Sequence, residues 1–222
     1  MINRINSLPE WDNPSAEMIK IDNLYRSYRE EIQLFMQAET GAVISLLNKD
    51  VIISGRINAM EVKKFFAFIK PESVFSSQEN LKQLFDGFES VNVIICEKPS
   101  KFKGGSVFND YFSSEEMYSI LNYGGFSLPP YEYFATDYCR RLNHGLIKVF
   151  GKKDTCAAII LENIKFRLLS GIVTKQKGLG SSLLLSAVSG DIPVLSICRD
   201  ELLPFYIKFG FKPLYKAGYW RK

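Results

Sequence analysis

The chain has 222 residues, enough for one large domain or two small ones, and 46% of them are hydrophobic, which suffices for a sizeable core. The 28 basic and 24 acidic residues leave a formal net charge of +4, which is too small and too dispersed to indicate a protein that binds nucleic acid. No apolar run is long enough to span a bilayer, and residues 1–15 lack the apolar centre of a signal peptide. We therefore expect a cytoplasmic protein that binds neither nucleic acid nor membranes.

The cysteines are far apart in the sequence and lie mostly in apolar, strand-like stretches. They are Cys96, Cys139, Cys156 and Cys198. None belongs to a Cys-x-x-Cys pair or to a Cys/His spacing that is typical of zinc sites. We interpret them as buried, reduced thiols, and the sequence predicts no metal site.

The first half of the chain, residues 1–104, is predicted to form a domain of its own. Asn58 can cap one of its helices, and Glu61 stands at the third position of that helix. Its elements, in chain order, are a helix near 18–38, a hairpin at 41–55 that turns at 48–50, a helix after Asn58, a strand near 72–76, a helix near 78–88 and a strand at 91–96.

The second half, residues 105–222, follows a linker that contains Pro99, Gly104 and Gly105. Ser113 and Glu116 form the pattern of a capping box at a helix start. A second helix is expected at 131–143. The segments "LIKVFG", "CAAIILEN" and "IKFRLLSGIVTK" then suit three successive strands of a meander.

The segment "TKQKGLGSSLLL" (174–185) lies between the third of these strands and a run with helical spacing. A strand, a glycine turn and a helix start are therefore expected here. The first amides of a helix have no partner within it and lie at the positive end of its dipole, so such a turn is suited to anions. Gly178 and Gly180 allow the backbone to approach a ligand closely. The sequence predicts a ligand that carries phosphate.

Two other phosphate-binding patterns fit this turn less well. The nucleotide P-loop needs Gly-x-x-x-x-Gly-Lys-Ser/Thr, which does not occur in the chain. The dinucleotide pattern Gly-x-Gly-x-x-Gly fails at Leu183, although Asp200 lies at a suitable distance to bind a ribose. A doubly wound domain also needs several further strand and helix units, and too few residues follow Gly180 to form them.

The stretch that follows the turn contains a second motif. "IPVLSIC" suits a strand, and "FYIKFGF" (205–211) suits a short helix that ends at Gly210. Together with "VTKQKGLGSSLL" (173–184), it resembles the acetyl-coenzyme A turn and following helix of the GCN5-related N-acetyltransferase (GNAT) family. The family pattern is Arg/Gln-x-x-Gly-x-Gly/Ala, then a strand, then a Tyr-containing helix closed by Gly-Phe. The resemblance covers residues 130–222 and implies the GNAT fold, an α+β fold with a mixed, mostly antiparallel sheet flanked by helices.

Two positions depart from the family pattern. Lys175 stands where Arg or Gln is usual, so a point charge replaces a planar fork of donors. Arg199 stands at a helix start where the family often has Asn. Most contacts to phosphate in such a turn come from backbone N–H groups, so neither change removes the predicted site.

The N-terminal half has a similar order of elements but no glycine-rich turn in the equivalent place. We interpret it as a degenerate GNAT-like copy that helps to form the acceptor cleft. An unrelated α+β cap over the substrate site is the alternative.

The resemblance implies that acetyl-coenzyme A (acetyl-CoA) is the co-substrate. The backbone of Ile172 and Val173 would pair with its pantetheine arm, and the amides of 176–181 would hold its pyrophosphate. Lys175 and Lys177 would add positive charge. The full set of expected coenzyme residues is Ile172, Val173, Thr174, Lys175, Gln176, Lys177, Gly178, Leu179, Gly180 and Ser181.

Tyr206 is the residue that the resemblance assigns to the leaving group. The family's Tyr commonly points its hydroxyl at the sulfur, where it can act as a general acid toward the departing thiolate. The alternative is an ordinary helix Tyr that packs its ring.

The general base is not assigned by the pattern. A carboxylate or an imidazole can take the proton of the amine through a water, so the candidates are His144, Asp137, Glu132 and Glu162. His144 can instead interact with a helix C-terminus next to Gly145. Asp137 and Glu132 can instead be solvated or paired with nearby arginines.

The sequence therefore favours an N-acetyltransferase that transfers the acetyl group of acetyl-CoA to a primary amine by direct attack. The acceptor, a small molecule or a peptide, is not specified by the sequence. One alternative is a catalytically inactive GNAT-like module that binds acyl-CoA or has a regulatory role. A dinucleotide-dependent oxidoreductase is the third interpretation.

Overall fold

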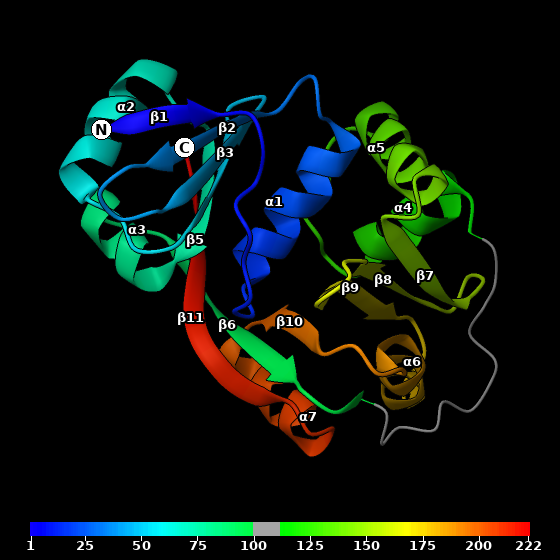
Figure 1. Cartoon of the computed structure of the whole chain (residues 1–222). Helices are drawn as coiled ribbons and strands as arrows, with labels where there is room; N and C mark the ends of the chain where they lie inside the picture. The colour runs from blue at the N-terminus through cyan, green and yellow to red at the C-terminus, as the bar shows by residue number, and fades with distance from the viewer. Residues whose placement is uncertain (100–111) are drawn as a thin grey trace. The chain divides into compact units, whose positions relative to one another are not determined.

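A computed structural model describes residues 1–99 and 112–222, and Figure 1 shows their helices and strands. The chain forms two compact units. The first contains Met1–Ile94 and Ile197–Lys222, and the second contains Ile95–Ser196. The predicted boundary between residues 104 and 105 lies outside the described residues. Residues 197–222, which the sequence places in the C-terminal half, group with the N-terminal unit.

The first unit is built on a sheet with the strand order β1-β2-β3-β4-β5-β11-β6. β4 and β5 pair in parallel, and β11 pairs antiparallel with β5. The strands are β1 (Ile2–Ile5), β2 (Gln33–Gln37), β3 (Val43–Leu47), β4 (Asp50–Ser54), β5 (Ser73–Ser77), β6 (Glu89–Cys96) and β11 (Lys212–Arg221). The helices are α1 (Ala16–Ser27), α2 (Ala59–Ile69), α3 (Gln78–Leu84) and α7 (Leu203–Lys208).

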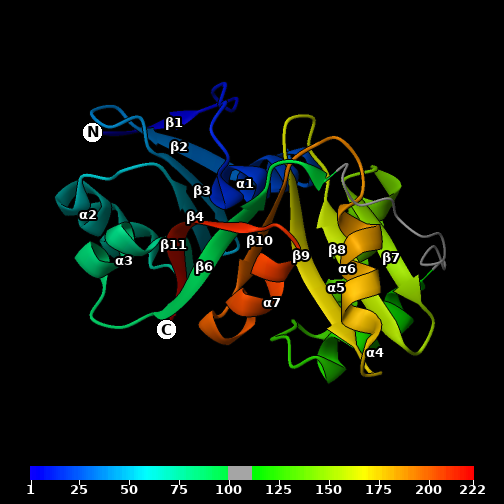
Figure 2. The same cartoon turned by 90° about the horizontal axis from the view of Figure 1, so that it is seen from below.

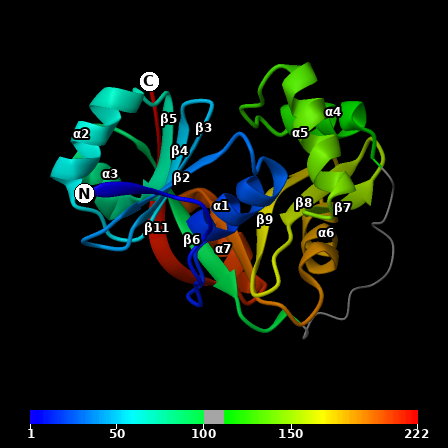
Figure 3. The same ribbon diagram turned by 45° about the horizontal axis from the view of Figure 1, so that its top comes forward.

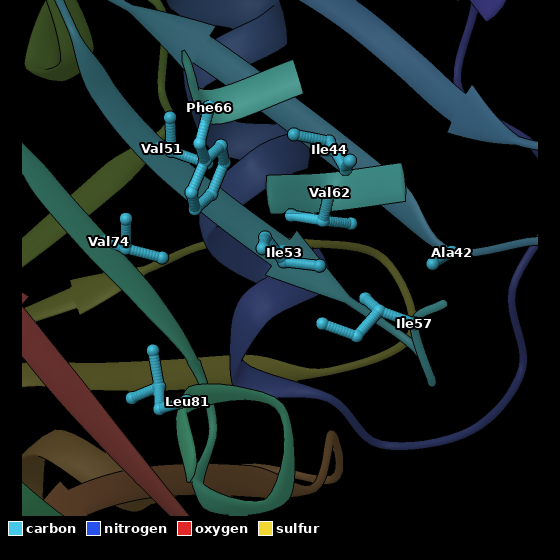
Figure 4. Close-up of a cluster of buried hydrophobic side chains, with 9 residues drawn as sticks. All are labelled: Ala42, Ile44, Val51, Ile53, Ile57, Val62, Phe66, Val74 and Leu81. Atoms are coloured by element: carbon cyan, nitrogen blue, oxygen red, sulfur yellow. The ribbon is translucent and has the colours of Figure 1, made fainter. Parts of the chain in front are cut away.

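Hydrophobic cores form on both faces of this sheet. Val62 and Phe66 of α2 pack with Ile44 of β3 in one cluster, which Figure 4 shows. Met18 of α1 packs with Val43 of β3 in the other. Val43 and Ile44 are neighbours in one strand, so their side chains point to opposite faces. Figures 1 and 3 accordingly show α2 and α3 on one side of these strands and α1 on the other.

The second unit has the strand order β10-β9-β8-β7. β7, β8 and β9 form an antiparallel meander, and β9 pairs in parallel with β10. Helices α4 and α5 lie on one face of the meander and α6 lies on the other (Figures 1 and 2). The elements are α4 (Ser114–Tyr123), α5 (Tyr131–Asn143), β7 (Ile147–Lys152), β8 (Cys156–Leu161), β9 (Arg167–Thr174), α6 (Leu179–Val188) and β10 (Val194–Cys198).

The turn between β3 and β4 and the start of α4 are as predicted. The hairpin of β3 and β4 turns at Asn48 and Lys49, which both have positive φ. Ser113 and Glu116 form the expected capping box at the start of α4.

The cysteines form no disulfide within the described residues. Cys96, Cys156 and Cys198 are buried, whereas the prediction of a buried thiol is wrong for Cys139, which is exposed on α5. Within residues 1–99 and 112–222, no helix has both the length and the apolarity to cross a membrane, and no cluster of His, Cys, Asp and Glu could hold a metal ion.

The long helix predicted at 18–38 is wrong. Helix α1 ends at Ser27, whose Oγ donates to the carbonyl of Asn23 at 2.7 Å, and β2 begins at Gln33. Ile32 and Leu34 are buried, whereas Gln33 between them is exposed. This period of two belongs to a strand, and pairing of β2 with both β1 and β3 stabilises it. Strand β1 is not predicted from the sequence.

Glu17 is a buried carboxyl group in the first turn of α1. Its side chain Oε2 accepts hydrogen bonds from Ser15 Oγ at 3.0 Å and from the hydroxyl of Tyr215. Its Oε1 is buried and has no hydrogen-bond partner among the described residues. Burial raises the pKa of Glu17 above its ordinary value of 4.5, and the hydrogen bonds from Tyr215 and Ser15 offset this only in part.

We expect Glu17→Gln to stabilise the protein more at about pH 8 than at about pH 5. Because the folded-state pKa is raised, the unfolded chain loses this proton first, and stability falls as the pH rises from 4.5 through the folded-state pKa. The slope is limited to about 1.4 kcal/mol per pH unit for one proton. Urea unfolding of both proteins across this range measures the effect. Exposed Glu10→Gln is the control, and a gain that does not change with pH would contradict the prediction.

Candidate functional site

The turn from β9 into α6 has the backbone geometry of an anion site. Gly178 is the N-cap of α6, with φ +94° and ψ −17°, a left-handed conformation that favours glycine. Gly178 has no side chain that could cap the helix, and α6 has no side-chain cap hydrogen bond within the described residues. The first turn of α6 also contains no acidic residue. The first backbone N–H groups of α6, at the positive end of the helix dipole, are therefore available to a ligand.

Strand β9 changes its pairing just before this turn. Its parallel ladder with β10 covers Arg167–Leu169, whereas its antiparallel ladder with β8 continues to Thr174. The register with β8 also shifts between Ile159 and Ile160, a bulge that leaves Ser170 without a direct partner. Within the described ladders, Ile172 and Val173 are thus paired on the β8 side only. Their other backbone edge can pair with an extended ligand.

The lysines of the turn differ in their surroundings. The backbone N–H of Lys175 donates to the carbonyl of Thr155 at 2.7 Å. Its Nζ lies 5.5 Å from the centre of the Tyr123 ring, in a cation–π contact. Gln176 and Lys177 are exposed. The turn therefore carries one cation held against an aromatic ring and one that extends into solvent.

The segment 123–126, which the sequence does not identify as part of the site, packs against the end of β9. A Cβ added to Gly124 would lie 2.5 Å from Val173 Cγ2, so only glycine fits beside β9 at this point. A Cβ added to Gly171 would lie 3.5 Å from the ring of Phe126. Tyr123 and Phe126 are 63% and 37% exposed, so both offer aromatic surface next to the open strand edge. Gly124 and Phe126 belong to the run "NYGGF" (122–126), and no local sequence pattern relates this run to β9.

Tyr206 lies in α7 of the first unit and is 3% exposed. Its ring makes edge contacts with Phe205 and Phe211, each with centroids 5.4 Å apart. Gly210 has φ +76°, as expected for the residue that ends this helix. The structure thus confirms the short helix and its stop, and the role of the hydroxyl stays a prediction.

A side chain from strand β6, which the sequence does not identify, forms hydrogen bonds to the segment just before α7. Asn92 of β6 donates from Nδ2 to the carbonyl of Cys198 at 3.3 Å and to Asp200 Oδ1 at 2.7 Å. Arg199, which departs from the Asn of the family pattern, donates from Nε to Glu89 Oε1 at 3.1 Å. An asparagine is therefore present at this helix start, but it comes from another strand.

The base candidates lie on or near α5. Asp137 pairs with Arg141 at 2.8 Å, and Glu132 is exposed in the first turn. His144 is the exposed C-cap of α5, and its backbone N–H donates to the carbonyl of Arg140. The position of His144 at the helix C-terminus, next to Gly145, is thus as expected, and the interaction of its imidazole with that terminus stays a prediction. Glu162 forms an ion pair with Lys148, whose Nζ lies 3.3 Å from Glu162 Oε2.

Strand register places His144 and Glu162 away from the glycine turn. β7 begins at Ile147 opposite Leu161, so both residues lie at the carboxyl end of β8. The turn follows Thr174, which pairs with Cys156 at the other end of β8. The length of that strand separates the two ends by roughly 17 Å. The structure does not bring these two candidates to the turn.

No protein-family model and no curated protein matches this sequence. Solved structures do match over nearly the whole chain. A tandem GNAT protein from the clavulanic acid biosynthesis pathway is 9% identical, with a TM-score of 0.57, over 96% of this chain and 89% of that one. The chain has the GNAT fold.

Two further structures agree with this assignment of the fold. A GCN5-related N-acetyltransferase from Sphaerobacter thermophilus is 14% identical, with a TM-score of 0.57, over 95% of this chain and 86% of that one. A Drosophila protein is 11% identical, with a TM-score of 0.58, over 94% and 90%. The predicted α+β GNAT fold is therefore confirmed.

The two turn glycines should respond in opposite ways to alanine. Gly178 has open space around its absent Cβ but a positive φ, so we expect Gly178→Ala to destabilise the protein by about 1 kcal/mol. Gly180 lies within α6, so we expect Gly180→Ala to stabilise it by about 0.5–1 kcal/mol. Chemical denaturation of both variants measures the difference. A shift of the same sign in both would mean that the turn does not have this backbone conformation.

Proposed function

We propose that the protein is an N-acetyltransferase that moves the acetyl group of acetyl-CoA to a primary amine. The observation that carries the proposal is the start of α6. It is an uncapped, acid-free helix N-terminus after a left-handed glycine, beside a strand edge that has left its parallel partner. A pyrophosphate joined to an extended amide-containing arm has the chemistry that this pair of features binds. The GNAT fold supports the proposal.

The residues of the turn fit the coenzyme as follows. The amides of Gln176 to Ser181 bind the pyrophosphate, and Lys175 and Lys177 contribute charge. The open edge of Ile172 and Val173 pairs with the pantetheine arm, next to Thr174. The cation–π contact with Tyr123 holds the Lys175 ammonium near the turn in the absence of ligand, which reduces the entropy that it loses on binding.

Direct attack of the amine on the thioester needs no enzyme nucleophile, and two of the buried thiols are unsuited to that role. Burial raises the pKa of Cys198 to about 11 and also raises the pKa of Cys96. Both stay protonated at neutral pH and are poor nucleophiles. In the proposed reaction the hydroxyl of Tyr206 donates to the sulfur as the thiolate departs. The amine proton passes through water to a base, for which Glu132, Asp137, His144 and Glu162 all stay predicted candidates, since the base acts at the thioester and not at the pyrophosphate turn.

The N-terminal half is proposed to be a degenerate copy of the C-terminal half. Each half has one or two helices, a three-stranded antiparallel meander, a helix, a strand parallel to the last meander strand, another helix and a final strand. In the first half, however, Asn58 caps α2, and Glu61 in its first turn accepts hydrogen bonds from Gln37 and the chain terminus. These groups occupy the positions that an anion needs, so the proposed coenzyme site is in the second half alone.

Acetyl-CoA should raise the melting temperature of the protein far more than NAD or ATP at equal concentration, because a ligand that binds only the folded state stabilises it by mass action. Equal protection by NAD would favour the oxidoreductase.

Gly180→Val should weaken coenzyme binding at least tenfold, or about 1.4 kcal/mol, because a branched side chain obstructs approach to the α6 amides. Ser182→Val places the same side chain at an exposed position of α6 and is the matched control. Calorimetric titration measures both. Full coenzyme affinity in Gly180→Val would mean that the pyrophosphate binds elsewhere.

Tyr206→Phe should lower kcat by roughly ten- to a thousandfold with coenzyme affinity nearly intact, because it removes a donor that acts in the transition state. Thiol release with a panel of amines measures the rate. Tyr138→Phe also removes a buried hydroxyl, which donates to the Phe112 carbonyl at 3.0 Å, and should leave kcat unchanged. An unchanged kcat in Tyr206→Phe, with chemistry rate-limiting, would make Tyr206 a packing residue. Coenzyme binding without thiol release for any amine would favour the inactive acyl-CoA-binding module.

A further inference from the structure

A small pocket in the first unit is lined by two arginines. It has a volume of about 120 Å³ and lies among β1, the end of α1 and the start of β2. Arg4 comes from β1, and Arg29 follows α1. Ile32 and Leu34, which are 6% and 2% exposed, belong to the hydrophobic core beneath it. Two permanently charged, exposed side chains therefore line one concave surface.

Neither arginine is ion-paired within residues 1–99 and 112–222. On the same helix Asp22 Oδ2 lies 3.7 Å from Arg26 Nη1, and Glu30 and Glu31, which follow Arg29 in the chain, do not line the pocket. Two guanidinium groups at one pocket repel each other, and a carboxylate from the chain that could neutralise them is not among the residues that line it. An anion from solution would remove this repulsion.

Arg29 is partly positioned before any ligand binds. Its Cζ lies 5.8 Å from the centre of the Tyr25 ring. The hydroxyl of Tyr25 donates to the carbonyl of Asn6 at 3.0 Å, and both residues line the pocket. The ring is thereby tied to the segment after β1, and it supports the guanidinium through a cation–π contact. The N–H donors of Arg29 stay available in this arrangement. The planar fork of a guanidinium matches two oxygens of a carboxylate or phosphate.

We propose that this pocket binds a small oxyanion, a carboxylate or phosphate group, between Arg4 and Arg29. The site is separate in the chain from the glycine turn and goes beyond the proposed acetyl transfer. No carboxylate is among the described residues that line the pocket, so an oxyanion there meets two guanidinium groups and no like charge.

Calorimetric titration of the full chain with inorganic phosphate and with succinate, at constant ionic strength set by chloride, tests the proposal. We expect saturable binding of at least one anion, and at least tenfold weaker binding in Arg4→Gln and in Arg29→Gln. Arg56→Gln removes an exposed arginine of the same unit that does not line the pocket, so it should bind as the wild type does. Arg4→Lys and Arg29→Lys keep the charge and lose the fork, and they should also bind more weakly.

Binding of phosphate alone would identify a phosphate site, and binding of succinate alone a carboxylate site. Without anion, the Arg→Gln variants should melt at the same temperature as the wild type or higher, because the repulsion is removed. Failure of both anions to bind, or equal weakening in Arg56→Gln, would overturn the proposal. Titration of acetyl-CoA into the same variants keeps the two sites distinguishable, since its affinity should not change.

Discussion

Helix α6 connects two parallel strands, and this requirement determines where its N-terminus lies. β9 and β10 run in the same direction, so the chain must return from the carboxyl end of β9 to the start of β10. α6 makes this return along one face of the meander (Figure 2). Its positive end consequently lies beside the residues of β9 that have left β10. The proposed anion site and the open strand edge are two results of one topological constraint.

The first unit meets the same constraint with different local chemistry. Helix α2 also connects two parallel strands, β4 and β5, whose ladder covers Asp50–Ile52. Its N-terminus is satisfied by the side chain of Asn58, and Glu61 places a negative charge in the first turn. Topology alone therefore does not create an anion site. A left-handed glycine without a capping side chain, as at Gly178, is needed as well.

The features that could be predicted from the sequence are those encoded by neighbouring residues. The glycine turn, the stop at Gly210 and the capping box at Ser113 each depend on a few consecutive positions, and the structure confirms them. Contacts between distant segments could not be predicted in this way. The approach of Gly124 to Val173 and the hydrogen bonds of Asn92 at the start of α7 depend on which strands and helices pack together. The same holds for β11, which pairs with β5 and so joins the N-terminal unit.

The wrong helix at 18–38 shows how strongly such pairing acts. Residues after Ser27 contain good helix formers, including Glu30 and Glu31, so local propensity favours continuation of α1. β1 supplies a partner strand in which Ile5 pairs with Leu34, and burial of Ile32 and Leu34 in the core outweighs the propensity. The chain therefore leaves the helix at Tyr28 and folds back along β1. That reversal brings Leu34 of β2 opposite Ile5 of β1, and both residues line the pocket together with Arg4 and Arg29. The strand pairing that defeats the local pattern is thus also what assembles the two-arginine pocket.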